Sequence, residues 1–177
     1  MVEIYCSYDL WGIGRVEGRC ENTYDKNPNT YYGVEVNRGL PTDNKYAAIG
    51  VAGVAITYGR NVTFRNIKSI VTAMASGGES KECGVAIGVF DKNGNEIARR
   101  VIEGELNRDE ITIPQYYGYT LCIAPYAAAA STETDILNAR ARIYEVTIPI
   151  SPLIIAIPVI IIAGVGTMYL LRRKSWD

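Results

Sequence analysis

The chain has 177 residues, a net charge of −1 and no histidine. A net charge near zero gives no general attraction to nucleic acid, so we expect no nucleic-acid partner. The lack of histidine removes the commonest general base, metal ligand and pH switch. The sequence also has no P-loop and no Cys-x-x-Cys pair. We therefore expect no cofactor and no metal site.

Carboxylates are the remaining route to catalysis, because two acidic side chains can hydrolyse a glycoside. Each candidate acidic residue lies in a stretch that we expect to be a turn or a solvent-exposed surface. Because no acid–base constellation emerges from the sequence, we predict that the protein is not an enzyme. The carboxylates concerned are Asp9, Asp25, Asp91, Glu103, Glu105, Asp109 and Glu110.

The first half of the chain reads as short strands separated by polar turns. Thirteen tyrosines against two phenylalanines, with many Val, Ile and Thr residues, make a composition typical of β-sheets. Glycines inside one apolar run predict a bulge at Gly50 or Gly53. The expected strands are 2–7, 31–36, 46–58 and 62–75, with turns at 40–44 and 60–61.

Residues 83–102 give the clearest hairpin signal in the chain. Two apolar runs flank a turn that contains Asn93-Gly94, a pair strongly preferred in tight hairpins. Asp91, Asn93 and Asn95 also stand at the alternate positions of a calcium loop. However, Glu96 occupies the place of the required glycine, and Ile102 that of the required glutamate. We therefore predict a hairpin and no calcium site.

The second half continues the β pattern. We expect a turn over 106–110 and strands over 111–113, 120–125 and 138–150. Residues 126–137 read as a short helix or an open loop, because four alanines precede a polar stretch. In the last strand, Arg140, Arg142, Tyr144, Val146 and Ile148 alternate onto one face, and Ala139, Ala141, Ile143 and Glu145 onto the other.

Eight or nine short strands at even spacing predict an antiparallel β-sandwich, with a jelly roll as one form of it. A closed barrel is the second choice. Tyr116, Tyr117 and Tyr119 form a cluster that would serve as a contact surface for a protein or a glycan. The plainer explanation is that tyrosine suits half-buried sheet faces.

Four cysteines are present, namely Cys6, Cys20, Cys83 and Cys122. In an oxidising compartment they would form two disulfides, with three pairings open. In a cytosolic protein they would be buried free thiols. Cys6 paired with Cys20 would staple the glycine-rich N-terminal stretch.

Residues 153–171 form an uncharged apolar run. A helix over this run would be roughly 28 Å long, close to the ~30 Å hydrocarbon core of a bilayer. We therefore divide the chain into a β head (1–149), a C-terminal transmembrane helix (150–171) and a basic tail (172–177). Small residues would permit contact between helices; these are Ala163, Gly164, Gly166 and Thr167.

Basic and aromatic residues flank the apolar run and would lie at the membrane interface. Those before it are Arg140 and Arg142, and those at or after its end are Tyr169, Arg172, Arg173, Lys174 and Trp176. The basic tail argues for an outward-facing head. The first residues do not resemble a signal peptide, which leaves a cytosolic tail-anchored orientation open.

These features favour a non-enzymatic, single-pass membrane protein that links a bilayer to a protein layer, as in a virion or a cell envelope. Its partners would be the lipid bilayer and other protein subunits, including copies of itself. The alternatives are a membrane-anchored binding module for a glycan or a protein receptor, and a cytosolic tail-anchored adaptor.

Overall fold

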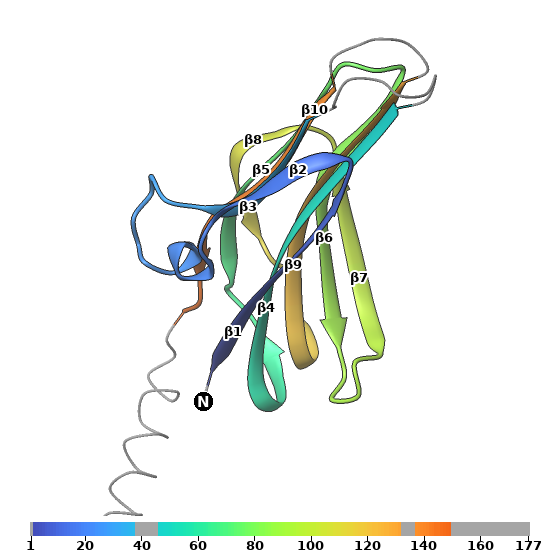
Figure 1. Cartoon of the computed structure of the whole chain (residues 1–177). Helices are drawn as coiled ribbons and strands as arrows, with labels where there is room; N and C mark the ends of the chain where they lie inside the picture. The colour runs from blue at the N-terminus through green and yellow to red at the C-terminus, as the bar shows by residue number, and fades with distance from the viewer. Residues whose placement is uncertain (1, 38–45, 132–136, 150–177) are drawn as a thin grey trace, which may run out of the picture. The chain divides into compact units, whose positions relative to one another are not determined.

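The computed structural model describes residues 2–37, 46–131 and 137–149. Residues Val2–Thr147 form one compact unit, shown in Figure 1. Within the described ranges this unit contains ten strands and one short 3₁₀ helix, and every strand pair is antiparallel. The strands form two five-stranded sheets that pack face to face.

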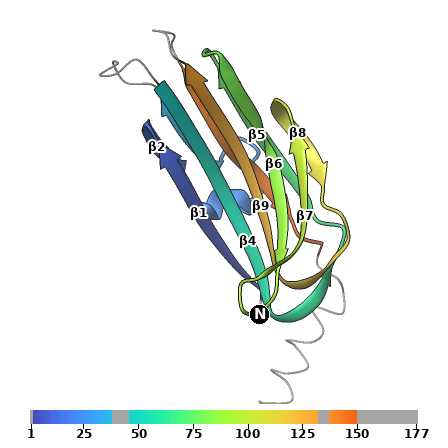
Figure 2. The same ribbon diagram turned by 90° about the vertical axis from the view of Figure 1, so that its right-hand side faces the viewer.

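The first sheet, here called sheet A, is built around the two longest strands of the unit. Its order is β1 (Glu3–Trp11), β4 (Tyr46–Phe64), β9 (Tyr116–Ser131), β6 (Ser80–Phe90) and β7 (Glu96–Glu103). Figure 2 shows these five strands side by side, with β9 in the middle.

The second sheet, sheet B, lies behind sheet A in that view. Its order is β2 (Ile13–Gly18), β3 (Tyr32–Asn37), β10 (Asn138–Thr147), β5 (Lys68–Ser76) and β8 (Leu106–Thr112). The 3₁₀ helix η1 (Cys20–Thr23) follows β2. Neighbouring strands are mostly distant in sequence, as in jelly-roll sandwiches.

The core lies between the sheets and follows the alternation of each strand. Val54 and Ile56 of β4 and Leu121 and Ile123 of β9 are fully buried, and so is Ile143 of β10. Burial of such side chains contributes about 1.5–3 kcal/mol each to folding. The sequence-based prediction of an antiparallel β-sandwich is therefore confirmed.

The predicted transmembrane helix (150–171) and basic tail (172–177) lie outside the described residues. Within residues 2–37, 46–131 and 137–149, no helix is long and apolar enough to cross a membrane.

Strand β9 is longer than we expected. The prediction of a short helix or open loop over 126–137 is wrong for its first six residues, which continue β9 to Ser131. Ala127 and Ala129 are buried in the core, and Tyr126, Ala128 and Ala130 point the other way. Alanine favours helices, but here packing outweighs that preference, because an extended strand places every second alanine against sheet B.

Two expected turns are also strands. Residues 106–110 belong to edge strand β8, whose exposed Asn107–Glu110 stretch looks like a turn because one side of an edge strand faces water. Residues 60–61 lie within β4, at a register shift between Thr57 and Val62. The chain instead turns at 65–67, before β5.

The alternation expected for the last strand holds only to Tyr144. A register shift between Ile143 and Glu145 changes the face of the residues that follow. Val146, expected beside Arg140 and Arg142, is therefore buried (4% exposed) on the side of Ile143.

The predicted hairpin joins β6 to β7. Gly94 has a φ of 84°, a backbone conformation that glycine adopts without strain. The Asp91 carboxylate accepts hydrogen bonds from the backbone N–H groups of Asn93 (2.8 Å) and Asn95 (2.9 Å) and from the Asn95 side-chain amide. These bonds, led by that of the Asn95 side chain, lower the pKa of Asp91.

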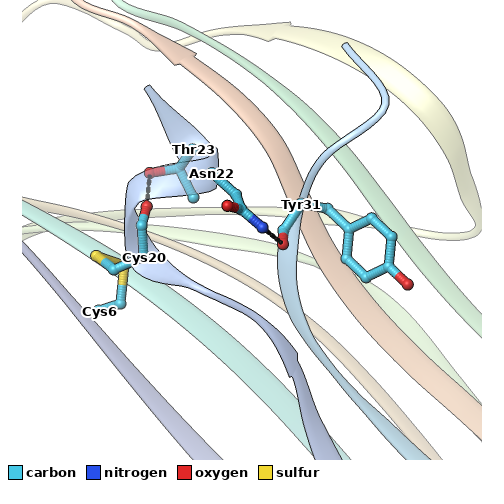
Figure 3. The surroundings of a disulfide bond; sticks show 5 residues. All are labelled: Cys6, Cys20, Asn22, Thr23 and Tyr31. Carbon is cyan, nitrogen blue, oxygen red and sulfur yellow. Dashed lines mark hydrogen bonds between the residues drawn. A yellow bond between two sulfur atoms is a disulfide. The ribbon is translucent and has the colours of Figure 1, made fainter. Parts of the chain in front are cut away.

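One disulfide joins Cys6 of β1 to Cys20 of η1, with an S–S distance of 2.04 Å and Cα atoms 5.5 Å apart (Figure 3). It links sheet A to the segment that follows β2. Nearby, the side-chain amide of Asn22 donates a hydrogen bond to the Tyr31 carbonyl (2.8 Å), and the Thr23 hydroxyl donates one to the Cys20 carbonyl (2.8 Å).

The second expected disulfide does not form, because Cys83 and Cys122 are free thiols. Cys83 lies opposite Ala127 on β9, and Cys122 lies opposite Gly88 on β6. Five residues of strand, or roughly 17 Å, therefore separate the two thiols along the sheet, far beyond disulfide reach.

Replacing both Cys6 and Cys20 by Ser should lower the free energy of unfolding by about 3 kcal/mol, because the bond closes a loop of 14 residues. Urea unfolding of the full-length chain would measure this. Reductant should bring the wild-type chain down to the stability of the double variant and leave the variant unchanged. Equal stability of the two proteins under oxidising conditions would contradict the pairing.

Candidate functional site

A hollow of about 380 Å³ opens at one edge of the sandwich. This volume is within the range of small-molecule sites. The hollow collects one aromatic ring, three carboxylates, one ammonium group and one thiol. The residues are Tyr126, Glu82, Glu103, Glu105, Lys81 and Cys83, with Ala75 and Gly104 completing the lining.

The hollow exists because the two edge strands stop early. β7 ends opposite Gly84, so residues 80–83 of β6 have no partner strand on that side. β8 begins opposite Ala73, so Ala75 of β5 likewise has no partner strand on that side. Gly104, with a φ of 111°, crosses from β7 toward β8 and donates its N–H to the Cys83 carbonyl (2.8 Å). Its backbone conformation favours glycine.

Register brings the ring and two of the carboxylates together. Gly84 pairs with Tyr126 on one side and with Glu103 on the other. A Cβ atom on Gly84 would lie 3.1 Å from the Tyr126 hydroxyl oxygen, so that hydroxyl lies over the glycine. Glu82 points to the same side as Gly84, two residues along β6.

The hollow is electronegative. Burial raises the pKa of the Tyr126 phenol, and the nearby charges of Glu103 and Glu82 raise it further. Burial and the charge of Glu105 raise the pKa of the Cys83 thiol in the same way. The thiol is therefore protonated at neutral pH and is a poor nucleophile.

The predicted contact cluster lies at the other end of β9. Tyr117 is 65% exposed, whereas Tyr116 and Tyr119 are half-buried. Seven to ten residues of strand, or roughly 23–33 Å, separate the members of this cluster from Tyr126. The cluster is thus distinct from the hollow.

The two predicted interface arginines before the apolar run have protein partners. Arg142 is only 13% exposed and pairs with Glu17, and its guanidinium lies 4.4 Å from the Tyr31 ring centre. Arg140 is half-buried and lies 3.4 Å from the Met74 sulfur. The prediction that they touch lipid headgroups stays a prediction.

The remaining predicted residues lie outside the described part of the chain. They are the interface residues Tyr169, Arg172, Arg173, Lys174 and Trp176, and the helix-contact residues Ala163, Gly164, Gly166 and Thr167.

The sequence pointed to part of the hollow but not to the hollow itself. Glu103 and Glu105 were among the carboxylates considered, but they looked like surface residues. Tyr126 begins the stretch predicted as a short helix or an open loop, and no prediction singled out Lys81 or Glu82. Only the register of β6 against β9 and β7 brings Tyr126, Glu82 and Glu103 together, and no local pattern reveals it.

No protein-family model matches the chain, and no curated protein matches it either. Solved structures do show similarity. The GH29 fucosidase of Ruminococcus gnavus, solved with fucose, is 12% identical, with a TM-score of 0.42. That match covers 82% of this chain and 25% of the fucosidase, so the chain spans about a quarter of its length.

Two smaller proteins match over most of their length. The CBM32 of AlyQ, in complex with 4,5-unsaturated mannuronic acid, is 14% identical with a TM-score of 0.38, and the match covers 78% of this chain and 95% of that one. The family 32 CBM of C. perfringens NanJ, in complex with galactose, is 15% identical with a TM-score of 0.35, covering 76% and 93%. At such scores the similarity assigns no function to this chain.

The Arg142–Glu17 ion pair leads to a prediction about the free energy of unfolding. Burial raises the pKa of Glu17, but the hydrogen bonds and charge of Arg142 outweigh burial, and the net pKa lies below the usual 4.5. Glu17→Gln should therefore lower the free energy of unfolding at pH 7 by about 1.5–3 kcal/mol. Thermal or urea unfolding across pH 3–7 would measure the change.

The lowered pKa of Glu17 determines how the stability effect of Glu17→Gln changes with pH. Because the pKa of Glu17 is lower in the folded than in the unfolded chain, its contribution is complete above about 4.5 and is lost as the pH falls through the folded value. The gap between wild type and variant should narrow on acidification. Glu110→Gln is the matched control, because its pair with Lys68 is half exposed and should contribute less than about 1 kcal/mol. A gap that is constant with pH would contradict this account.

Proposed function

We propose that this β-sandwich is a non-catalytic glycan-binding module and that the hollow beside Tyr126 is its binding site. The observation that carries the proposal is that the Tyr126 ring meets charged hydrogen-bonding groups from two other chain segments, 81–82 and 103–105, in one hollow. Such a concave site with a few convergent polar groups is the usual form of a small-ligand site.

The chemistry of the lining suits sugar hydroxyl groups. A carboxylate presents two acceptor oxygens, so Glu82, Glu103 and Glu105 can each accept hydrogen bonds from neighbouring hydroxyls. Lys81 supplies donors to a sugar oxygen. The Tyr126 ring offers an apolar surface with a polar tip, which matches the mixed surface of a sugar ring.

The excess of carboxylates in the hollow restricts the charge of the glycan that it can bind. Three carboxylates face one ammonium group in the hollow, and like charges in a low-dielectric site are costly. The site should therefore prefer neutral glycans over those that carry carboxylate or sulfate groups.

Binding of the full-length chain in neutral detergent to an array of neutral, amino and acidic glycans tests the proposal. Glu103→Gln should weaken binding of the preferred neutral glycan about tenfold or more, because a hydrogen bond to a charged group contributes ~1.5–3 kcal/mol. Tyr126→Ala should weaken it by a similar factor, because it removes the aromatic surface on which the sugar ring packs. Calorimetric titration would measure both affinities.

Tyr117→Ala is the matched control, since Tyr117 is an exposed tyrosine on the same strand. It should leave affinity unchanged. Loss of binding in this control with retention in Tyr126→Ala would move the site to the tyrosine cluster and contradict the proposal. So would a lack of binding to every glycan on the array.

A second candidate function is assembly into a protein layer. The observation that favours it is an outer face on sheet A whose three central strands carry no charge over residues 51–55, 84–88 and 122–126. The proposal that residues 150–171 hold the module at a bilayer rests on the sequence alone, as does an outward-facing head.

A further inference from the structure

The outer face of sheet A has an unusual composition. Its three central strands carry small or apolar side chains and no charge between residues 51–55 of β4, 122–126 of β9 and 84–88 of β6. We call this the small-residue face. Its residues are Val51, Gly53, Ala55, Cys122, Ala124, Tyr126, Gly84, Ala86 and Gly88.

Large apolar side chains project into solvent around this face. Tyr5 and Trp11 on β1 are 54% and 59% exposed, Ile49 on β4 is 39% exposed, and Val101 on β7 is 43% exposed. All four share the outward side with the small-residue face, as their register partners show.

The outer face of sheet B is different. Arg15 pairs with Glu17 and Glu35, and Glu17 also pairs with Arg142, so ion pairs run across β2, β3 and β10. Such a face is suited to water. The contrast shows that an uncharged centre is a property of the outer face of sheet A and not of the whole unit.

Three rows of opposed residues cross sheet A. The upper row is Asp9, Val51, Tyr126, Gly84 and Glu103. The middle row contains Ser7, Gly53, Ala124, Ala86 and Val101. The lower row is Tyr5, Ala55, Cys122, Gly88 and Arg99.

The charges lie symmetrically about the middle row. On β7, Arg99 and Glu103 stand two residues to either side of Val101, on the outward side. On β1, Tyr5 and Asp9 stand two residues to either side of Ser7. β7 therefore carries complementary charges at equal distances from the middle row. On β1 the Tyr5 hydroxyl, the counterpart of Asp9, already donates to Glu3, so a bond to Asp9 of a second copy would replace that one.

We propose that the small-residue face binds the same face of a second copy of this chain, with a two-fold axis along the middle row. This rotation places Arg99 of each copy opposite Glu103 of the other, and Tyr5 opposite Asp9 of the other. A two-fold interface is self-complementary by definition, so each contact occurs twice. The strands of the facing sheets then run antiparallel, within the aligned class of sheet packing.

A dimer contact of stable size has to cover the whole outer side of sheet A. The three central strands over five residues give only roughly 240 Å², whereas all five strands, about 4.8 Å apart and about 30 Å long, give roughly 700 Å² per copy. The larger figure is close to the ~800 Å² per partner of standard interfaces.

Flatness favours a second copy over an irregular partner. At the centre of the face, around Gly53, Ala86 and Ala124, the side chains supply neither knobs nor pockets for a side chain of another protein to engage. Toward its ends, the Phe90 ring lies over Gly88 and the Tyr126 hydroxyl lies over Gly84. The small central side chains do allow two sheets to approach closely, as identical small-residue faces do when they stack. The face also carries its own matching charges, because Arg99 and Glu103 stand at equal distances from the middle row.

Arg99 is free to make the proposed contact. It donates to Glu96 through Nε and one terminal nitrogen, at 3.0 and 2.7 Å, yet its side chain is 63% exposed. A guanidinium has five N–H donors, so donors remain for a carboxylate of a second copy.

A charge exchange tests the proposal in the full-length chain in neutral detergent. Arg99→Glu would place two carboxylates together across the interface, and Glu103→Arg would place two guanidinium groups together. Each single variant should weaken self-association about tenfold, because like charges in an interface are repulsive. The double variant restores opposite charges and should recover association to within about threefold of wild type.

Sedimentation equilibrium would measure association of the four proteins. Contacts through any other segment are the same in all four, so they do not affect the comparison. A monomeric wild type, equal association of all four proteins, or a double variant no better than the singles would each overturn the proposal.

A crosslink tests the axis itself. In a Cys122→Ser background, Ala86→Cys lies in the middle row and should form a disulfide dimer on mild oxidation. Thr112→Cys, exposed on edge strand β8 of sheet B, is the matched control and should stay monomeric. Equal dimer yields from both would overturn the arrangement.

The dimer test is separate from the glycan proposal. Glu105→Gln alters the hollow but not the small-residue face, so it should weaken sugar binding and leave association unchanged. Ala86→Arg should do the reverse. Tyr126 and Glu103 belong to both surfaces, so a bound glycan should lower the dimer fraction, and dimerisation should weaken glycan binding by the same factor.

Discussion

The pairing of β4 with β9 is the interaction on which the sandwich depends. These strands have 19 and 16 residues, the longest among the ten described. Their inner side chains, from Ala52 to Ile56 and from Leu121 to Ile123, form one wall of the core. β1 and β6 extend this pair on either side, and β3, β5 and β10 of sheet B pack against it.

The same pair sets the distance between the sheets. A Cβ atom on Gly50 would lie 2.9 Å from a methyl carbon of Val34 and from one of Val36, so only glycine fits there. Ala127 and Ala129 continue this narrow part of the core along β9. Toward the other end of the strands, Ile56 and Leu121 fill a wider space. Small inner residues are thus a packing requirement.

No such requirement applies on the outer side of sheet A. Ala55, Ala86 and Ala124 face away from the core, where a long polar side chain would cost nothing in packing. Sheet B has such side chains in the corresponding place, including Arg15 and Glu35. Small residues on both sides of β9 therefore have two separate physical reasons, which is why we read the outer ones as an interface.

Local patterns predicted much of this fold. The Asn93-Gly94 turn and the strands over 2–7, 31–36 and 138–147 follow from alternation and turn residues, and the staple between Cys6 and Cys20 is confirmed. The errors arose where tertiary contacts override local preference. The alanine run after Tyr126 is a strand because sheet B covers it, and the polar 106–110 stretch is a strand because it lies at an edge.

The candidate site was harder to predict. Glu82, Glu103 and Tyr126 are far apart in the sequence and meet only through the register of three strands. The free state of Cys83 and Cys122 depends on the same register. The residues of the hollow can be found in the sequence, but local patterns do not reveal which strands are neighbours in the sheets.

The most direct test of the central claim is to map the contacts of the preferred neutral glycan on the full-length chain by NMR. Titration should shift the backbone amide signals of Lys81–Gly84 and of Gly104 and Glu105, where the hollow opens. Shifts confined to the tyrosines at residues 116–119, or no saturable shifts at all, would contradict the assignment of the hollow as the binding site.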